Sequence, residues 1–121
     1  MARVILVADD NPGFADLLRA TLEEAGYEVA TASTGLAAVA AMQNRDVALA
    51  VLDVLMPGIS GDAVAERLRQ LDPTLPVLLM TGADSGFAAG SGLPVLRKPF
   101  APEALVEAVT RLVPPSAQEV D

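Results

Sequence analysis

Apolar and polar positions follow a repeated order along the chain: a short apolar run, then a longer segment with apolar and polar residues mixed. Runs of the first kind cover residues 3–8, 27–32, 47–52, 77–80 and 93–97. Short apolar runs bounded by polar or turn residues are typical of strands buried on both faces of a parallel sheet. The pattern therefore predicts five such strands.

The segments between the first three runs carry residues that begin and end helices. Asn11 is suited to the N-cap of a first helix, Pro12 to its first position and Gly26 to its end. The apolar residues between these limits recur at helical spacing. Ser33 or Thr34 can cap a second helix that runs to about residue 44.

The later segments predict two more helices and one weak point. A third helix is expected over residues 61–71, with Val64, Leu68 and Leu71 on its buried face. The last helix opens at residues 101–103 and ends before Pro114. Residues 82–92 hold four glycines and two serines, so we expect the fourth helix to be short or absent.

Alternating strands and helices imply an α/β fold with a parallel sheet covered on both faces. Five strands suit the doubly wound, flavodoxin-like order 2-1-3-4-5. The 121 residues are enough for one domain and too few for two ordinary ones. We expect one domain over residues 1–115 and a disordered tail over residues 116–121.

Composition narrows the chemistry that this domain can perform. The chain has no cysteine and no histidine, which excludes thiolate and imidazole metal ligands as well as histidine-based triads. Any metal must then be a hard cation on oxygen ligands, which favours magnesium or calcium.

The charge balance and the hydropathy pattern bear on partners and location. Sixteen acidic residues against eight basic ones give a net charge of -8, which argues against direct contact with nucleic acid. No apolar stretch reaches the roughly 20 residues of a membrane helix, and the first residues lack the pattern of a signal peptide. We therefore expect a cytoplasmic protein with no membrane or nucleic-acid partner.

Four of the five predicted strands end in residues that can bind or react. Asp9 and Asp10 follow the first strand, Asp53 the third, Thr81 the fourth and Lys98 the fifth. Each has an ordinary explanation by itself, such as capping, strand propensity or a solvated charge. Open α/β sheets bind their ligands at the carboxyl ends of the strands, where these residues are expected to meet. Their joint occurrence therefore favours a functional site.

The residue types at this edge suit a divalent cation and a phosphoryl group. Three crowded carboxylates repel each other, and a bound cation such as Mg²⁺ relieves that repulsion. A carboxylate beside the cation can attack phosphorus and give an aspartyl phosphate. The hydroxyl of Thr81 and the ammonium group of Lys98 can bind the charged phosphoryl oxygens.

Four motifs contain these residues: Ala-Asp-Asp at 8–10, Leu-Asp-Val-Leu-Met-Pro-Gly-Ile-Ser-Gly at 52–61, Met-Thr-Gly at 80–82 and Arg-Lys-Pro-Phe at 97–100. Together they resemble the receiver domain of two-component response regulators, over residues 3–113. The resemblance implies that Asp53 accepts a phosphoryl group from a phosphohistidine on a sensor histidine kinase or a histidine phosphotransfer protein. It also implies a signalling module that changes protein–protein contacts and is not an enzyme for a separate substrate.

The resemblance also assigns a metal site. It implies that Asp10, Asp53 and the backbone carbonyl of Leu55 ligate Mg²⁺, and that Asp9 holds a water bound to the metal. By the same resemblance, Thr81 is the switch hydroxyl and Lys98 pairs with the phosphoryl group.

The chain departs from the usual receiver pattern in two places. Val95 stands where receivers often carry a Tyr or Phe that couples to phosphorylation. The glycine-rich segment 82–92 resembles that of receivers attached to hybrid kinases and of some single-domain receivers. We hypothesise that this segment signals by changing its order. We also expect either a stand-alone receiver or an excised piece of a longer chain.

Three alternatives use the same residues differently. A degenerate receiver would bind partners without phosphorylation, although the intact acidic and basic residues argue against it. A phosphatase of the haloacid dehalogenase type would carry a second acid where Leu55 stands. A flavodoxin-like nucleotide-binding protein would need a phosphate loop, but the segment after the first strand is acidic.

Overall fold

The computed structural model describes residues 3–56, 58–82 and 92–115 of the chain. Strands and helices alternate along most of this length, as predicted. In chain order they are β1 (Val4–Ala8), α1 (Pro12–Glu24), β2 (Val29–Ala32), α2 (Gly35–Asn44), β3 (Val47–Asp53), α3 (Gly61–Leu71), β4 (Val77–Thr81), β5 (Val95–Arg97) and α5 (Pro102–Leu112).

The strands form one parallel sheet in the order β2-β1-β3-β4-β5. This confirms the predicted doubly wound order. Every residue of β1, β3 and β4 is buried, as expected for continuous apolar runs in the centre of such a sheet. The edge strand β5 is partly exposed.

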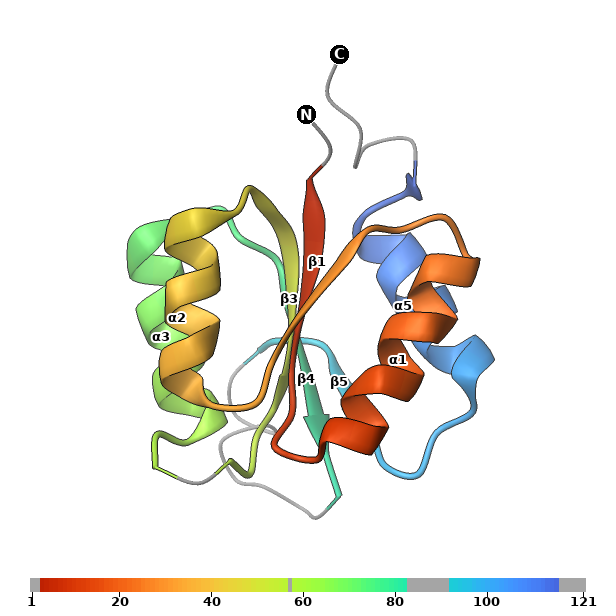
Figure 1. The fold of residues 1–121 in the computed structure, drawn as a ribbon, viewed down its shortest axis with the longest axis horizontal. Helices are drawn as coiled ribbons and strands as arrows, with labels where there is room; N and C mark the ends of the chain where they lie inside the picture. Colours follow the sequence, from red (N-terminus) through yellow and green to blue (C-terminus); the bar gives the residue numbers. More distant parts are fainter. Residues whose placement is uncertain (1–2, 57, 83–91, 116–121) are drawn as a thin grey trace.

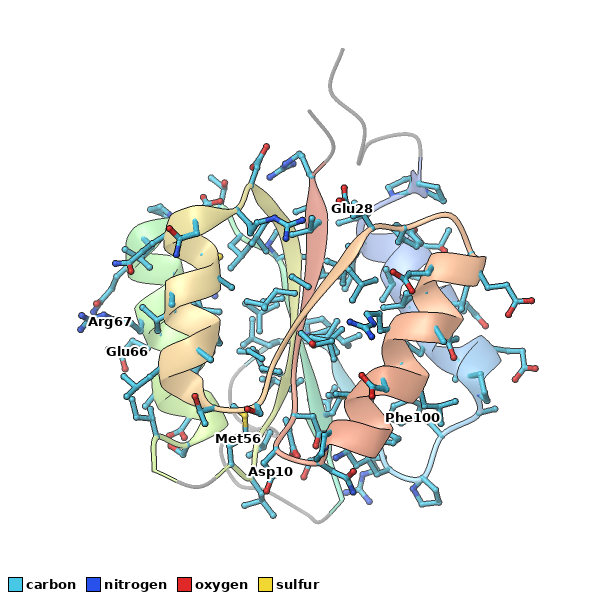
Figure 2. The ribbon with its side chains drawn as sticks, viewed as in Figure 1. Asp10, Glu28, Met56, Glu66, Arg67 and Phe100 are labelled. Carbon is cyan, nitrogen blue, oxygen red and sulfur yellow. The ribbon has the colours of Figure 1, made fainter. Side chains whose placement is uncertain are left out.

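Helices cover both faces of the sheet, with α2 and α3 on one face and α1 and α5 on the other (Figure 1). The alternation of side chains along β1 divides the core in the same way. Leu6 lies in a cluster with Val64 of α3, whereas Ile5 lies in a second cluster with Leu22 of α1. Apolar side chains fill the space on both sides of the sheet (Figure 2).

The helix starts confirm the predicted caps. The side chain of Asn11 accepts a hydrogen bond from the N–H of Phe14 at 3.1 Å, which caps α1. Of the two candidates for the second cap, Thr34 is used, and its hydroxyl accepts from the N–H of Ala37 at 3.0 Å. Gly26 has a φ of +100°, which a glycine adopts without the penalty a side chain brings.

Some boundaries and one core position differ from the sequence-based expectations. β2 starts at Val29, two residues later than predicted, and Tyr27 is instead a buried residue of the loop before it. β5 is shorter than predicted. Leu71 was expected on the buried face of α3, and this was wrong: it is 46% exposed, because it is the last residue of α3 and lies one turn beyond Leu68, the last buried position of the helix.

Two predictions fall on residues that the structure does not describe. The shortened fourth helix concerns residues 83–91, and the disordered tail concerns residues 116–121, so both stay predictions. Within the described ranges, no helix is long and apolar enough to cross a membrane.

Candidate functional site

The polar residues singled out in the sequence meet at the carboxyl ends of the strands. Asp9 directly follows β1, Asp53 ends β3 and Thr81 ends β4, and their exposed fractions are only 1%, 5% and 3%. Lys98 directly follows β5 and is partly buried. Asp10 is exposed, and its side chain lies at this edge of the molecule (Figure 2).

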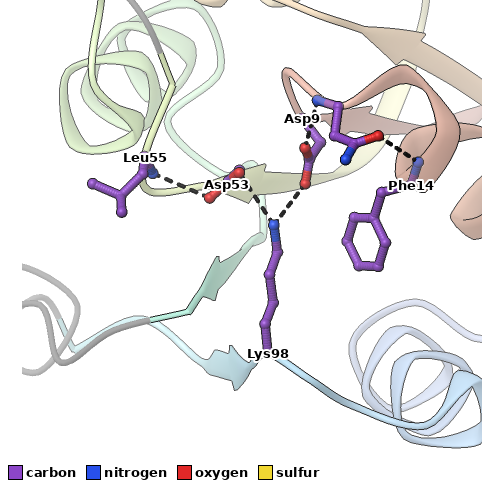
Figure 3. A network of polar contacts seen from close by, with 6 residues as sticks. Asp9, Phe14, Asp53, Leu55 and Lys98 are labelled. Atoms are coloured by element: carbon purple, nitrogen blue, oxygen red, sulfur yellow. Dashed lines mark hydrogen bonds and ion pairs between the residues drawn. The ribbon is translucent and has the colours of Figure 1, made fainter.

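The carboxylate of Asp53 is held by two donors from different elements (Figure 3). Its Oδ1 accepts from the backbone N–H of Leu55 at 3.1 Å, and its Oδ2 accepts from the ammonium group of Lys98 at 3.2 Å. The side chain of Leu55 is 66% exposed, so this residue meets the site through its backbone. The predicted role of the Leu55 carbonyl as a metal ligand stays a prediction.

Backbone contacts fix the turn that follows Asp53. The N–H of Val54 donates to the carbonyl of Met80 at 2.9 Å, which ties the end of β3 to β4. The N–H of Gly61 donates to the carbonyl of Val54 at 2.9 Å. A side chain at position 61 would meet the Asp53 carbonyl oxygen at 2.4 Å, so α3 can start this close to the site only with a glycine there.

The ammonium group of Lys98 joins the two buried carboxylates (Figure 3). Its Nζ lies 2.8 Å from Oδ2 of Asp9 and 3.2 Å from Oδ2 of Asp53. The backbone N–H of Lys98 donates to the carbonyl of Thr81 at 2.8 Å, which anchors the residue at the sheet edge. The peptide bond between Lys98 and Pro99 is cis.

Three carboxylates converge at this edge and could hold a cation. Asp9, Asp10 and Asp53 each offer an oxygen, and these oxygens all lie within 4.8 Å of one another. Oδ1 of Asp9 accepts from the N–H of Asn11 at 2.9 Å, which orients that carboxylate. Hard oxygen donors of this kind, two buried and one open to solvent, fit Mg²⁺ with part of its water shell retained.

Burial and charge act in opposite directions on these groups. Burial raises the pKa of Asp53 above its usual value, and the negative charge of Asp9 adds to this. The Leu55 N–H and the Lys98 ammonium group oppose that rise. Burial alone would lower the pKa of Lys98, but its hydrogen bonds to Asp9 and Asp53 outweigh this and raise it, so Lys98 stays charged. Three carboxylates therefore face one ammonium group, an excess of negative charge that a divalent cation would neutralise.

Comparison with known proteins identifies the family. Residues 5–110 match the response regulator receiver domain. The chain belongs to this family. It is 38% identical over 108 residues to the probable transcriptional regulatory protein TcrX of Mycobacterium tuberculosis, covering 84% of this chain and 46% of that protein. It is 37% identical over 119 residues to the alkaline phosphatase synthesis transcriptional regulatory protein PhoP of Bacillus subtilis, covering 92% of this chain and 50% of that protein.

Solved structures of receivers share the fold. The chemotaxis protein CheY4 of Vibrio cholerae superposes with a TM-score of 0.85 at 29% identity, over 93% of this chain and 100% of that one. The response regulator protein TrrA of Thermotoga maritima, solved in complex with Mg²⁺ and BeF, superposes with a TM-score of 0.83 at 33% identity, over 92% of this chain and 99% of that one. The recognition of a receiver from four sequence motifs is thus confirmed.

One expectation about partners is not supported by these relatives. The chain spans about half the length of the transcriptional regulators it matches. Because those proteins are named as regulators of transcription, the predicted absence of any nucleic-acid partner finds no support in them. The net charge of -8 bears only on this domain itself.

The structure adds residues that sequence reasoning had placed only in the core or left out. The ring of Phe14, assigned from the sequence to the apolar stripe of the first helix, lies under the ammonium group of Lys98, with Nζ 4.7 Å from the ring centroid. Phe100 contacts Phe14 edge to face, with centroids 5.8 Å apart. Composition held a clue: the chain has three phenylalanines and a single lysine, and Phe14 contacts that lysine while Phe100 packs against Phe14.

Proposed function

We propose that this receiver is a phosphoacceptor module of a two-component phosphorelay, with Asp53 as the residue that is phosphorylated. The observation that supports this most directly is the environment of Asp53. Its carboxylate ends β3 almost fully buried, held by the Leu55 N–H and the Lys98 ammonium group, with two further carboxylates beside it. This arrangement aims a carboxylate and a cationic donor at one point of the sheet edge.

In the proposed step, an oxygen of Asp53 attacks the phosphorus of a phosphohistidine on a sensor histidine kinase or a histidine phosphotransfer protein. The P–N bond breaks, and its electron pair stays on the departing imidazole nitrogen. The ammonium group of Lys98 then directs one of its N–H donors to a phosphoryl oxygen instead of to a carboxylate. The Thr81 hydroxyl, at the end of the neighbouring strand, is the proposed second donor to that group.

Mg²⁺ is the proposed cofactor. Asp10, Asp53 and the backbone carbonyl of Leu55 would hold it directly, and Asp9 would hold one of its waters. When bound, the cation neutralises the carboxylates and the charge of the phosphoryl oxygens. The relative TrrA, solved with Mg²⁺ and BeF, supports the assignment because beryllium fluoride imitates a phosphoryl group.

The proposed output is a change of protein contacts and not the turnover of a separate substrate. The domain promotes only the phosphorylation and dephosphorylation of its own Asp53. We propose a cytoplasmic location, where a sensor kinase would present its phosphohistidine.

The test uses the purified chain with Mg²⁺ and beryllofluoride, followed by ¹H–¹⁵N NMR spectra. We expect shifts of amide signals around Asp53, Thr81 and Lys98 in the wild-type protein only when both Mg²⁺ and beryllofluoride are present. Incubation with acetyl phosphate and Mg²⁺ should add the mass of one phosphoryl group. Asp53→Asn keeps the shape of the side chain and should abolish both responses.

The matched control is Asp46→Asn, which removes an exposed carboxylate paired with Arg3 outside the site. This variant should respond like the wild-type protein. A wild-type protein that takes up neither beryllofluoride nor a phosphoryl group would instead favour the degenerate receiver, a binding module that works without phosphorylation.

A further inference from the structure

Lys98 is in contact with an aromatic ring as well as with two carboxylates. Its Nζ lies 4.7 Å from the centroid of the Phe14 ring, within the roughly 6 Å over which an aromatic face attracts a cation. Figure 3 shows the ring of Phe14 beside the lysine side chain, with Asp9 and Asp53 at the tip of that side chain. The ammonium group therefore has oxygen acceptors on one side and an aromatic ring on another.

The ring is itself held in place by its surroundings. Phe100 packs edge to face against Phe14, with centroids 5.8 Å apart and ring planes at 65°. Asn11 accepts from the N–H of Phe14 through its side chain, while its own N–H donates to Asp9. A short chain of contacts thus links the backbone that carries Phe14 to one of the two carboxylates that bind Lys98.

We propose that Phe14 is a positioning residue for Lys98. An ammonium group has three N–H donors, and two of them are directed to Asp9 and Asp53. The ring attracts the positive charge but does not accept a conventional hydrogen bond as an oxygen does. It therefore holds the ammonium group in place and leaves its N–H donors available. Lys98 can then turn a donor to a phosphoryl oxygen while it stays over the ring. This role rests on the proposed function of Asp53.

The first test observes Lys98 directly and needs no phosphoryl mimic. Lys98 is the only lysine of the chain, so labelling with ¹³C-lysine gives one set of side-chain signals. We expect the ε-methylene protons of Lys98 to be shifted upfield by the ring current of Phe14. Phe14→Leu and Phe14→Met, which keep an apolar side chain but remove the ring, should both abolish this shift, and Phe14→Tyr should retain it.

The second test measures the affinity for beryllofluoride in the presence of Mg²⁺. Loss of the ring should weaken binding about two- to fivefold, the range expected for a partly exposed cation–π contact. Phe14→Tyr should bind like the wild-type protein. In a Lys98→Met background, Phe14→Leu should cause no further loss, because its effect acts through the ammonium group.

The outcomes separate this proposal from its alternatives. Leu17→Ala, which truncates an exposed apolar side chain on the same helix, should leave both measurements unchanged. An unshifted Lys98 signal in the wild-type protein would overturn the proposal, as would an equal loss from Phe14→Leu with and without Lys98. If the wild-type protein failed to bind beryllofluoride, the proposed function of Asp53 would fail, but the ring-current test would still decide where Lys98 sits.

Discussion

Gly61 marks the point where α3 comes closest to the reactive end of β3. It is buried, and a Cβ atom built on it would lie 2.4 Å from the Asp53 carbonyl oxygen and 2.6 Å from the Cα of Val54. Real Cβ atoms keep at least 3.0 Å from such neighbours. In Gly61→Ala, either α3 or the end of β3 must therefore move.

The loss of stability caused by that movement can be estimated from the atoms involved. Both nearest neighbours are backbone atoms, which cannot turn aside as a flexible side chain can. Overpacking of a close-packed interior costs about 1–3 kcal/mol, and the better helix propensity of alanine returns at most about 1 kcal/mol. We expect a net loss of about 1–2 kcal/mol in the free energy of unfolding, together with weaker binding of Mg²⁺ and beryllofluoride.

Urea denaturation and a beryllofluoride titration measure the two effects. The matched control is Gly13→Ala in the first turn of α1, where the nearest atom to a new Cβ would be the side-chain oxygen of Asn11 at an ordinary 3.5 Å. This control should be as stable as the wild-type protein or up to about 1 kcal/mol more stable. A Gly61→Ala protein with unchanged stability and unchanged affinity would refute the reasoning from the close approach.

Three further predictions follow from the same contacts. Lys98→Met should weaken beryllofluoride binding by about tenfold or more in titrations, because it removes a charged hydrogen bond to the bound group; an affinity within twofold of wild type would contradict this. Asp53→Asn should raise the melting temperature at neutral pH without Mg²⁺, because burial raises the pKa of Asp53 and its ionised form therefore costs stability. That gain should shrink as the pH falls through the raised pKa of Asp53 and vanish below 3.8, where the carboxyl is protonated in both folded and unfolded chains, and a gain independent of pH would count against it. Tyr27→Phe should lose about 1–2 kcal/mol in urea denaturation, since the Tyr27 hydroxyl donates to the Val113 carbonyl at 2.5 Å, and beryllofluoride binding should not change.

Local patterns in the sequence predicted most of the fold. Continuous apolar runs such as residues 47–52 can only be satisfied where both faces of a strand are covered, and β3 is buried along its whole length. Asn11 and Pro12 predicted the start of α1 because capping depends on neighbouring residues alone. The errors lay at the ends of elements. Tyr27 was predicted to be in a strand and Leu71 to be buried, but the burial of a terminal residue depends on which other elements pack against that end, and local spacing does not show this.

The residues of the candidate site could also be predicted from the sequence, because they lie at the carboxyl ends of the strands. Asp9, Asp53 and Thr81 were expected to meet, and all three are buried at one edge of the sheet. The contacts between these residues could not be predicted from the sequence. Periodicity cannot say that Lys98 lies between Asp9 and Asp53, because that depends on the distance a side chain must span between β5 and β1.

The sequence by itself determined the order of elements, the sheet that contains them and the residues available at its carboxyl edge, since each follows from local spacing and from the rules of parallel sheets. Only the tertiary structure decided which of those residues touch. The ring of Phe14 under Lys98 joins positions far apart in the chain, and the approach of Gly61 to Asp53 depends on where α3 lies against the end of β3. Such contacts are set by how whole helices pack on the sheet, to within a fraction of an ångström, and a residue pattern carries no measure of that distance.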